Sequence, residues 1–398
     1  MPYDFDTAVN RKRTNSVKHD FAEQYGLGYN CIPLWIADMD FRTVPEVCRA
    51  LQKRVEHGVF GYSQPGGGYF TAVGQWLASR HNWRVEPRWL ALTEGVLPAV
   101  STAIAVLTKP GDSVLIQTPS YNQFNMVIEK SRRKVVKNPL VLEGEAYRVD
   151  FDDFERQIER NGVKAFVLCS PHNPVGRVWT EDELVSMGEI CMRHGVKVIS
   201  DEIFADLVYP GHRHTVFASL SREFLDNTVT CMSPTKTFNL SGAPLSNIFI
   251  ADDDTRYDFE EEHKARGNLG VSALPAVAAQ AAYEHGAPWL DELMEYLGGN
   301  VAHARDFVKG RLPDVGWTEP EGTYLLWLDF RRAGFWAREL EAFIADEAKI
   351  LLSSEPGAEG FLRLNLASPR SVIEKALRQL EGALERAPSR RADLSPIE

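Results

Sequence analysis

Residues 196–203 read VKVISDEI, an apolar run that ends in two adjacent carboxylates. Six more short apolar runs lie between residues 89 and 250, and segments of helical period separate several of them. Near-continuous apolar strands that alternate with helices are typical of a mostly parallel sheet covered on both faces. We therefore predict an α/β fold with strands at residues 89–93, 113–117, 134–138, 165–169, 196–200, 228–232 and 247–250, and helices at residues 97–107, 121–132 and 181–194.

The length of the chain predicts more than one domain, because its 398 residues exceed the roughly 250–300 at which one hydrophobic core stops growing. Hydrophobic residues make up 44% and charged residues 25%, which excludes a disordered, collagen-like or membrane-embedded chain. After residue 290 the pattern changes to an amphipathic helix, a strand over 322–330, a helix and a strand over 360–366. We expect an N-terminal segment (1–44) that packs with a smaller α+β domain (291–386), a large cofactor-binding α/β domain (45–290) and a flexible tail (387–398).

Charge and cysteine content narrow the classes of partner. The 44 Lys and Arg residues against 55 Asp and Glu residues give a net charge of −11, which disfavours nucleic acid and anionic membranes. The five cysteines are widely spaced without a Cys-x-x-Cys pair, so we expect neither a disulfide framework nor a metal site. Residues 1–10 lack the apolar core of a signal peptide, and no window of about 18 apolar residues occurs, so we expect a cytoplasmic protein.

Polar residues follow the predicted strands at their carboxyl ends, where sheets of this type bind ligands. Gly95 stands where the first strand meets a helix; such a start binds an anion through its free N–H groups or is simply a helix cap. Asn173 lies between two prolines after the fourth strand. The prolines hold its amide in a set direction for a ligand, although Asn-Pro turns are also common without one.

Two charged residues stand at the ends of later strands, and a third stands inside one. Asp201 ends the fifth strand, where a carboxylate pairs with a ligand or caps a helix. Lys236 follows the sixth strand, where desolvation lowers the pKa of an amine and makes it a nucleophile, unless the side chain reaches solvent. Arg363 stands inside an apolar strand and needs an anion, which is either a structural carboxylate or a substrate's.

These five positions together match the needs of one ligand, an aldehyde cofactor with a phosphate, a ring hydroxyl and a ring nitrogen. The helix start at Gly95 would hold the phosphate, and the Asn173 amide the hydroxyl. Asp201 would keep the ring nitrogen protonated, and Lys236 would join the aldehyde.

The chain resembles the fold-type I pyridoxal-phosphate enzymes, and most of all their MalY/PatB branch of cystathionine β-lyases. The resemblance covers nearly the whole chain; residues 35–40 (WIADMD) are specific to the branch, whereas the Asn, Asp and Lys motifs are shared with aminotransferases. It implies an aspartate aminotransferase-like fold, with a large domain built on a seven-stranded mostly parallel sheet and a smaller α+β domain. The matching stretches are residues 11–20, 33–41, 60–62, 118–121, 170–176, 200–203, 234–239 and 322–325.

The same resemblance assigns roles toward pyridoxal 5'-phosphate. It implies that Lys236 is the Schiff-base lysine and general base, that Asp201 pairs with the ring nitrogen and that Asn173 bonds the ring hydroxyl. Tyr121 stacks on the ring and, with Ala37, borders the substrate. The phosphate is implied to be surrounded by Gly95, Val96, Leu97 and Ser233, and to be reached by Tyr62 from a neighbouring subunit. For both tyrosines, ordinary packing is the alternative.

The implied assembly is a homodimer with shared sites, and the implied partner is a small amino-acid substrate whose α-carboxylate Arg363 clamps in a bidentate manner. The implied reaction is the α,β-elimination of cystathionine or a related cysteine S-conjugate to a thiol, pyruvate and ammonia. An aminotransferase of the same fold is one alternative, because fold and cofactor residues do not separate the two reactions. A binding or regulatory protein that keeps the fold is the other.

Three departures from the family pattern bear on specificity. Phe204 stands where a histidine is expected, which removes a polar group near the cofactor. Pro244 occupies the place of a phosphate-binding arginine of many aminotransferases, which favours the lyase branch, although Ala243 and Pro244 differ from the usual lyase residues as well. The stretch 353–360 is shorter than the usual loop before the arginine strand. Because that loop borders the substrate, we expect it to affect which substrate is taken.

Overall fold

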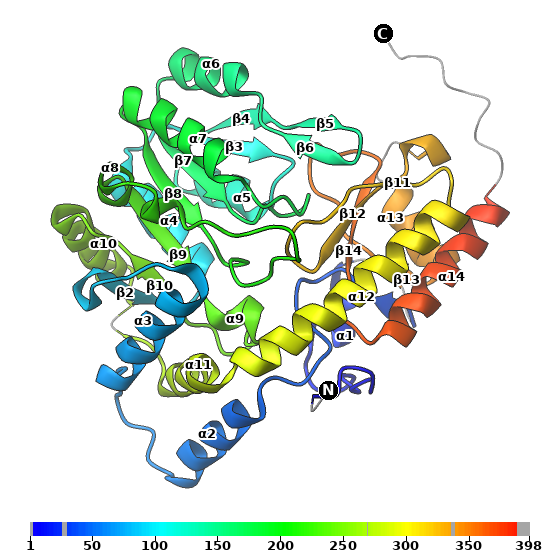
Figure 1. Cartoon of the computed structure of the whole chain (residues 1–398), viewed down its shortest axis with the longest axis horizontal. Helices are drawn as coiled ribbons and strands as arrows, with labels where there is room; N and C mark the ends of the chain where they lie inside the picture. Colours follow the sequence, from blue (N-terminus) through cyan, green and yellow to red (C-terminus); the bar gives the residue numbers. More distant parts are fainter. Residues whose placement is uncertain (1–2, 26–29, 269, 336–338, 388–398) are drawn as a thin grey trace.

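A seven-stranded sheet forms the centre of the larger lobe in the computed structural model, which describes residues 3–25, 30–268, 270–335 and 339–387 (Figure 1). Strand β10 is antiparallel to both of its neighbours, and the other pairings are parallel, which confirms the prediction of a mostly parallel sheet. In sheet order the strands are β2 (Leu90–Thr93), β10 (Ser246–Phe249), β9 (Thr228–Met232), β8 (Lys197–Asp201), β7 (Val163–Cys169), β3 (Ser113–Thr118) and β4 (Lys134–Pro139).

Helices cover both faces of this sheet, because successive side chains of a strand point to opposite faces. In β8, Val198 packs with the cluster under α6, α7 and α8, whereas Ile199 packs with the cluster under α4, α5 and α10. In β9, Met232 packs with α3 and α11. The helices are α3 (Gly67–His81), α4 (Val96–Leu107), α5 (Gln123–Lys130), α6 (Phe151–Asn161), α7 (Glu181–Arg193), α8 (Arg222–Asp226), α10 (Asp253–Ala265) and α11 (Ala273–His285).

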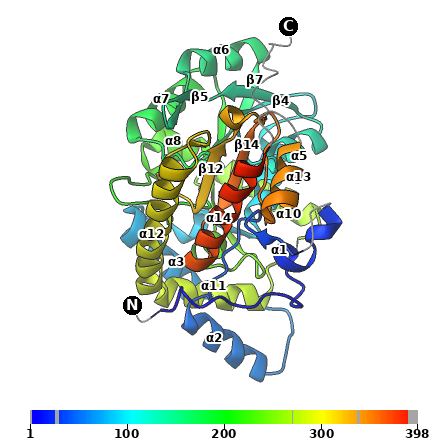
Figure 2. The ribbon, with the colours of Figure 1, turned by 90° about the vertical axis from the view of Figure 1, so that its right-hand side faces the viewer.

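A second lobe holds a three-stranded antiparallel sheet in the order β11-β12-β14, with α12 and α14 packed side by side over it (Figures 1 and 2). The long helix α12 runs from the end of α11 across to this lobe. The elements are α12 (Ala287–Arg311), β11 (Gly316–Trp317), β12 (Leu325–Asp329), α13 (Glu339–Phe343), a π-helical turn at Ile344–Ala348, β13 (Ile350–Leu351), β14 (Phe361–Asn365) and α14 (Arg370–Arg386).

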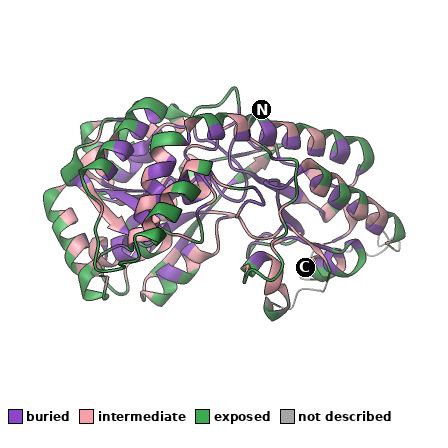
Figure 3. Cartoon of the chain, turned by 90° about the horizontal axis from the view of Figure 1, so that it is seen from below, coloured by how far each residue is buried: buried purple, intermediate pink, exposed green. Residues whose placement is uncertain are grey.

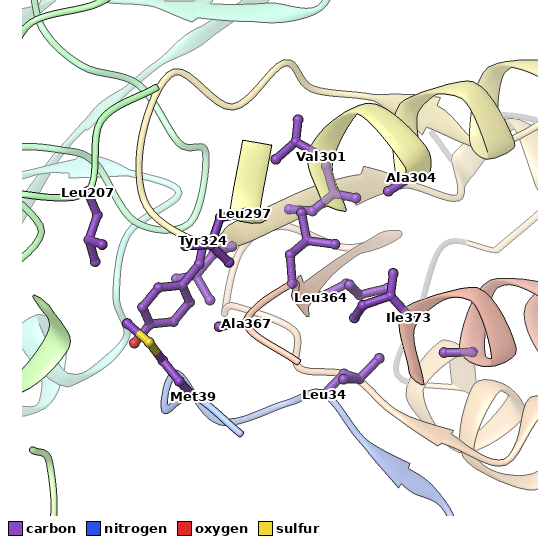
Figure 4. Close-up of a cluster of buried hydrophobic side chains, with 14 of the residues drawn as sticks. Leu34, Met39, Leu207, Leu297, Val301, Ala304, Tyr324, Leu364, Ala367 and Ile373 are labelled. Atoms are coloured by element: carbon purple, nitrogen blue, oxygen red, sulfur yellow. The ribbon is translucent and has the colours of Figure 1, made fainter. Parts of the chain in front are cut away.

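The N-terminal segment joins the second lobe, since β1 (Ile32–Pro33) pairs in parallel with β13. Figure 4 shows Leu34 and Met39 of this segment beside the same buried cluster as Tyr324 and Leu364. The segment also reaches the large sheet's lobe, because the Met39 amide donates to the Asn239 carboxamide oxygen at 3.0 Å. Residues 34–39 therefore run between the two lobes.

A buried cluster of charged residues ties residues 11–18 to Asp40. The Asp40 carboxylate accepts hydrogen bonds from Lys18 at 2.9 Å and from Arg11 at 2.8 Å. Lys18 belongs to α1 (Val17–Asp20) and its side chain is fully buried. Because removing one partner would leave a buried charge uncompensated, the cluster fixes α1 beside residues 38–40.

The domain limits stay a prediction: residue 291 falls inside α12, and all of the expected tail except Ala387 lies outside the described residues. Both lobes have a buried interior, with exposed residues along the outer helix faces (Figure 3). Within the described parts of the chain, every helix is too short or too polar to cross a membrane.

The remaining elements are the short helices at Ala22–Tyr25, Pro87–Trp89, Phe217–Ser219 and Arg331–Ala333, α2 (Pro45–Glu56), α9 (Pro234–Thr237), β5 (Val141–Glu143) and β6 (Ala146–Arg148).

Candidate active site

A cavity of about 560 Å³ lies at the carboxyl ends of β7 and β8, between the large sheet and the second lobe. Asn173 follows β7, Asp201 ends β8, and Lys236 follows β9. Arg363 enters from β14, in the other lobe. The cavity is lined by most of the residues that the sequence singled out: Ala37, Gly95, Val96, Leu97, Tyr121, Asn173, Asp201, Lys236 and Arg363.

Asp201 places a carboxylate at the floor of this cavity. It is 6% exposed, and one of its oxygens accepts the Ile203 amide at 3.1 Å, which satisfies it as a turn cap. Burial is the main cause that raises the pKa of Asp201 to about 7; the Glu202 charge acts in the same direction, and the Ile203 amide and Lys236 oppose it. A buried carboxylate of this kind regains its charge beside a cation, so the position suits a protonated ring nitrogen.

Lys236 is presented by the short helix α9. Its Nζ donates to the Ala37 carbonyl oxygen at 2.6 Å, and the Tyr324 hydroxyl donates to the same oxygen at 2.9 Å. Burial lowers the pKa of Lys236 to about 8, an effect that the Asp38 and Asp201 charges partly oppose. An amine that loses its proton near pH 8 can act as nucleophile and as base.

The N-terminus of α4 supplies an anion site at one end of the cavity. Gly95 precedes this 12-residue helix with φ +125°, a backbone conformation that side-chain-bearing residues rarely adopt. Val96 and Leu97 are the first two residues of this helix, and their backbone N–H groups have no hydrogen-bond partner within it. The hydroxyl-bearing residues Thr235 and Ser241 also line the cavity.

Ser233 is not among the lining residues. Its hydroxyl donates to the Leu245 carbonyl oxygen at 2.7 Å and accepts the Thr235 amide at 3.2 Å, which caps α9. Ser233 thus caps the helix that carries Lys236. Thr235, two residues later, is the one of the two that lines the cavity.

Arg363 marks the opposite end of the cavity. Its Nη1 donates to the Asn173 carboxamide oxygen and to Glu355 Oε1, each at 3.0 Å, and its Nη2 donates to the Trp35 carbonyl oxygen at 3.2 Å. The Nε atom is buried without a hydrogen-bond partner. Because Asn173 uses its oxygen for Arg363, its amide group is left to donate, as a ring hydroxyl requires.

The aromatic residues divide into those at the cavity and those outside it. Tyr121 lines the cavity and packs edge-on against Phe124 at a centroid distance of 5.7 Å, and burial raises its pKa. Phe204 lines it too and packs edge-on against Tyr324 at 5.6 Å, so the position expected to hold histidine is filled by an apolar contact. Tyr62 is fully exposed and does not line the cavity of its own chain.

Several lining residues were not singled out from the sequence. Trp35 and Ile36 belong to the block 35–40, which served only as a family signature, although Asn365 binds the carbonyl oxygens of Ile36 and Asp38. Thr235 and Ser241 flank Lys236 along the chain, and that proximity was the available signal. Glu355, which binds Arg363 but does not itself line the cavity, carried no sequence signal, because Arg363 is eight residues away across a strand pairing.

Comparison with known proteins places this geometry in a family. The family model "Aminotransferase class I and II" matches residues 29–380. The chain is 41% identical to cystathionine beta-lyase PatB of Bacillus subtilis, covering 96% of this chain and 99% of that protein. It is 33% identical to protein MalY of Escherichia coli, again over 96% and 99%.

Among solved structures, cystalysin from Treponema denticola, which contains a pyridoxal 5'-phosphate cofactor, superposes with a TM-score of 0.93 at 37% identity. The alignment covers 97% of this chain and 99% of that one. These similarities confirm the predicted resemblance and fold. The chain belongs to the aminotransferase class I and II family, on the branch of the cystathionine β-lyases.

Proposed function

We propose that the protein is a pyridoxal 5'-phosphate-dependent carbon–sulfur β-lyase that converts cystathionine or a related cysteine S-conjugate to a thiol, pyruvate and ammonia. The observation that carries the proposal is the gathering of Lys236, Asp201 and Arg363 around one cavity. The full-length similarity to a cystathionine β-lyase and to a pyridoxal-phosphate-containing structure supports it.

The residues of the cavity fit this cofactor. The buried Asp201 carboxylate suits a cationic ring nitrogen, and the Asn173 amide is free to donate to a ring hydroxyl. The helix start at Gly95, with the side chains of Thr235 and Ser241 on the same cavity, suits a phosphate. When bound, the cofactor supplies an electron sink for negative charge that develops at the substrate Cα.

The protein's own groups then bind and orient the substrate. The Nε and Nη2 groups of Arg363 take the α-carboxylate, which fixes the direction of the Cα–H bond. The Lys236 amine removes the Cα proton, for which a pKa of about 8 is well matched. Apolar walls that include Trp35, Ile203 and Phe204 limit the access of water.

Loss of the Cα proton allows the Cβ–S bond to break, and the sulfur leaves as a thiolate with the electron pair of that bond. The released 2-aminoacrylate is hydrolysed to pyruvate and ammonia. Residue positions alone do not separate this outcome from transamination, because both begin with removal of the same proton.

Pyruvate release from cystathionine in the absence of any 2-oxo acid tests the proposal. We expect pyruvate, ammonia and a thiol in equal amounts. If no pyruvate forms, and an added 2-oxo acid is instead converted to an amino acid, the protein is an aminotransferase and the lyase proposal is wrong.

We further propose a homodimer in which Tyr62 serves the site of the second subunit. Tyr62 is fully exposed, and Val55, Val59 and Phe60 nearby along the chain are also more than half exposed, which gives α2 and the segment after it an uncovered apolar surface. The mass in solution, measured by light scattering, checks the assembly. A cytoplasmic location stays a prediction.

A further inference from the structure

A carboxylate lies against the guanidinium that faces the substrate. Glu355 is 5% exposed and belongs to the loop between β13 and β14, the stretch whose shortness the sequence marked. Its Oε1 accepts from Arg363 Nη1 at 3.0 Å, and its Oε2 accepts from the Asn122 amide at 3.1 Å. Both carboxylate oxygens are therefore engaged, one by the arginine and one by the backbone beside Tyr121.

This contact limits what Arg363 can offer a ligand. A guanidinium has five N–H groups. Nη1 gives its two to Glu355 and Asn173, and Nη2 gives one to the Trp35 carbonyl oxygen. The two that remain are the N–H of Nε, buried and without a partner in the chain, and one on Nη2. Two donors on neighbouring nitrogens are the number that one carboxylate takes.

The contact also changes the charge at this end of the cavity. Arg363 contributes +1 and Glu355 −1, so the pair is neutral before a substrate binds. Once one α-carboxylate is bound, the local charge becomes −1. Of the described residues that line the cavity, only Lys236 and Arg363 carry a cationic side chain, and Lys236 faces Ala37 and the cofactor position. A substrate side chain that ends in a lone carboxylate thus meets repulsion from Glu355, and the described lining residues offer it no further cation.

We propose that Glu355 determines substrate specificity: it restricts the site to amino acids whose side chain carries no net negative charge, which admits the zwitterionic side chain of cystathionine, and it disfavours a side chain that ends in a lone carboxylate. The inference rests on the proposed function only in that Arg363 binds the substrate α-carboxylate. Glu355 acts through Arg363 and is a positioning residue as well, because its bond to the Asn122 amide ties the arginine to the segment that carries Tyr121.

Two S-conjugates of nearly equal shape test the proposal in the holoenzyme. S-carbamoylmethyl-L-cysteine and S-carboxymethyl-L-cysteine differ by an amide against a carboxylate, so the ratio of their kcat/KM values reports the charge preference. A like charge within about 10 Å changes binding by about tenfold or more at the effective dielectric of a protein site. We expect the unmodified enzyme to prefer the amide by at least about tenfold.

The variant Glu355→Gln keeps the shape of the side chain and removes its charge. We expect it to reduce the preference for the amide by about tenfold, mainly through a lower KM for the carboxylate substrate. Glu355→Asp, which keeps the charge, should retain the preference. Glu359→Gln is the matched control, since Glu359 is an exposed carboxylate of the same loop and should leave the ratio unchanged. An unchanged ratio in Glu355→Gln, or a parallel rise of both KM values, overturns the proposal.

A binding measurement separates this proposal from the lyase proposal. L-glutamine and L-glutamate form a second amide and carboxylate pair, and their binding to the holoenzyme is followed by the visible absorbance of the cofactor. If neither S-conjugate yields pyruvate, the lyase proposal fails, but the glutamine-to-glutamate affinity ratio still tests Glu355. If Glu355→Gln does not fold, as judged by circular dichroism, the unmodified enzyme decides: equal affinity for the two amino acids overturns the inference.

Discussion

The two ends of the cavity are built in different ways. At the cofactor end, Asn173, Asp201 and Lys236 follow three strands that are direct neighbours in one sheet. At the substrate end, Arg363 binds Glu355 and also the carbonyl oxygen of Trp35, which is 328 residues from Arg363 along the chain. The cofactor end is formed along one edge of a single sheet, whereas the substrate end is formed by segments that are distant in sequence.

The positions of the residues at the two ends are therefore fixed in different ways. The register of the sheet aligns Cys169 with Asp201 and Asp201 with Cys231, so the residues that follow these strands must emerge together. The substrate end has no common sheet. Its backbone is held instead by side chains, chiefly Asn365, which donates to the Ile36 carbonyl oxygen at 2.7 Å and to that of Asp38 at 2.6 Å. We therefore expect variants at the two ends to fail differently.

The largest effect is expected at the cofactor end. Lys236→Ala removes the base, and we expect pyruvate release from cystathionine to fall by about 10⁴-fold or more while the fold is retained. Pyruvate formation and the visible absorbance of the cofactor are the measurements. A variant that kept its turnover would exclude Lys236 as the base. A variant that lost turnover but kept the protein's role in the cell would favour the binding or regulatory alternative.

Asp201→Asn separates function from stability at the same end. In the cofactor-free protein, burial raises the pKa of Asp201 from 3.8 to about 7, so the folded state binds the proton more tightly than the unfolded state. The stability from this group is present below pH 4 and is lost as pH rises to 7. An asparagine at position 201 keeps the side-chain oxygen that accepts the Ile203 amide and removes the buried negative charge.

At pH 8 we therefore expect the cofactor-free Asp201→Asn variant to unfold with a free energy up to about 4 kcal/mol higher than the original, a difference that shrinks toward pH 4. Denaturant titrations at both pH values measure it. Turnover of the loaded variant should fall, because the ring nitrogen loses its anionic partner. Equal stability of the two proteins at pH 8 would contradict a costly buried carboxylate.

A smaller effect is expected at the substrate end. Asn365→Ala leaves the Ile36 and Asp38 carbonyl oxygens without a donor, and we expect a loss of about 2 kcal/mol in the free energy of unfolding. Because Trp35 and Ala37 in the same segment contact Arg363 and Lys236, KM should also rise. The paired measurement of unfolding and KM distinguishes this variant from a purely structural one.

Asn247→Ala is its matched control. Asn247 is an equally buried asparagine in the large sheet, where it bonds the hydroxyls of Tyr69 and Tyr283 and does not line the cavity. We expect a similar loss of stability with an unchanged KM. If both asparagine variants change KM alike, the hydrogen bonds from Asn365 to residues 36 and 38 do not position the substrate end.

The sequence predicted the sheet better than the substrate end. The apolar runs placed all seven strands to within two or three residues, because strands buried on both faces must be apolar almost throughout. Ligands of such sheets bind at the carboxyl ends of the strands, and this position singled out Asn173, Asp201 and Lys236. The place of Ser233 beside the phosphate stays a prediction; its hydroxyl caps α9 in the structure, and a local cap cannot be told from a ligand contact by residue type.

Residue pattern and periodicity were enough to predict the family, the sheet and the order in which the cofactor-end residues follow its strands, since all three depend on local sequence. Three contacts became visible only in the folded chain: Glu355 binds Arg363, Lys236 reaches the Ala37 carbonyl oxygen, and residues 35–38 pass between the lobes. Those contacts depend on how two lobes pack around a segment from the far end of the chain. No spacing along the sequence encodes a hydrogen bond between residues that only packing brings together.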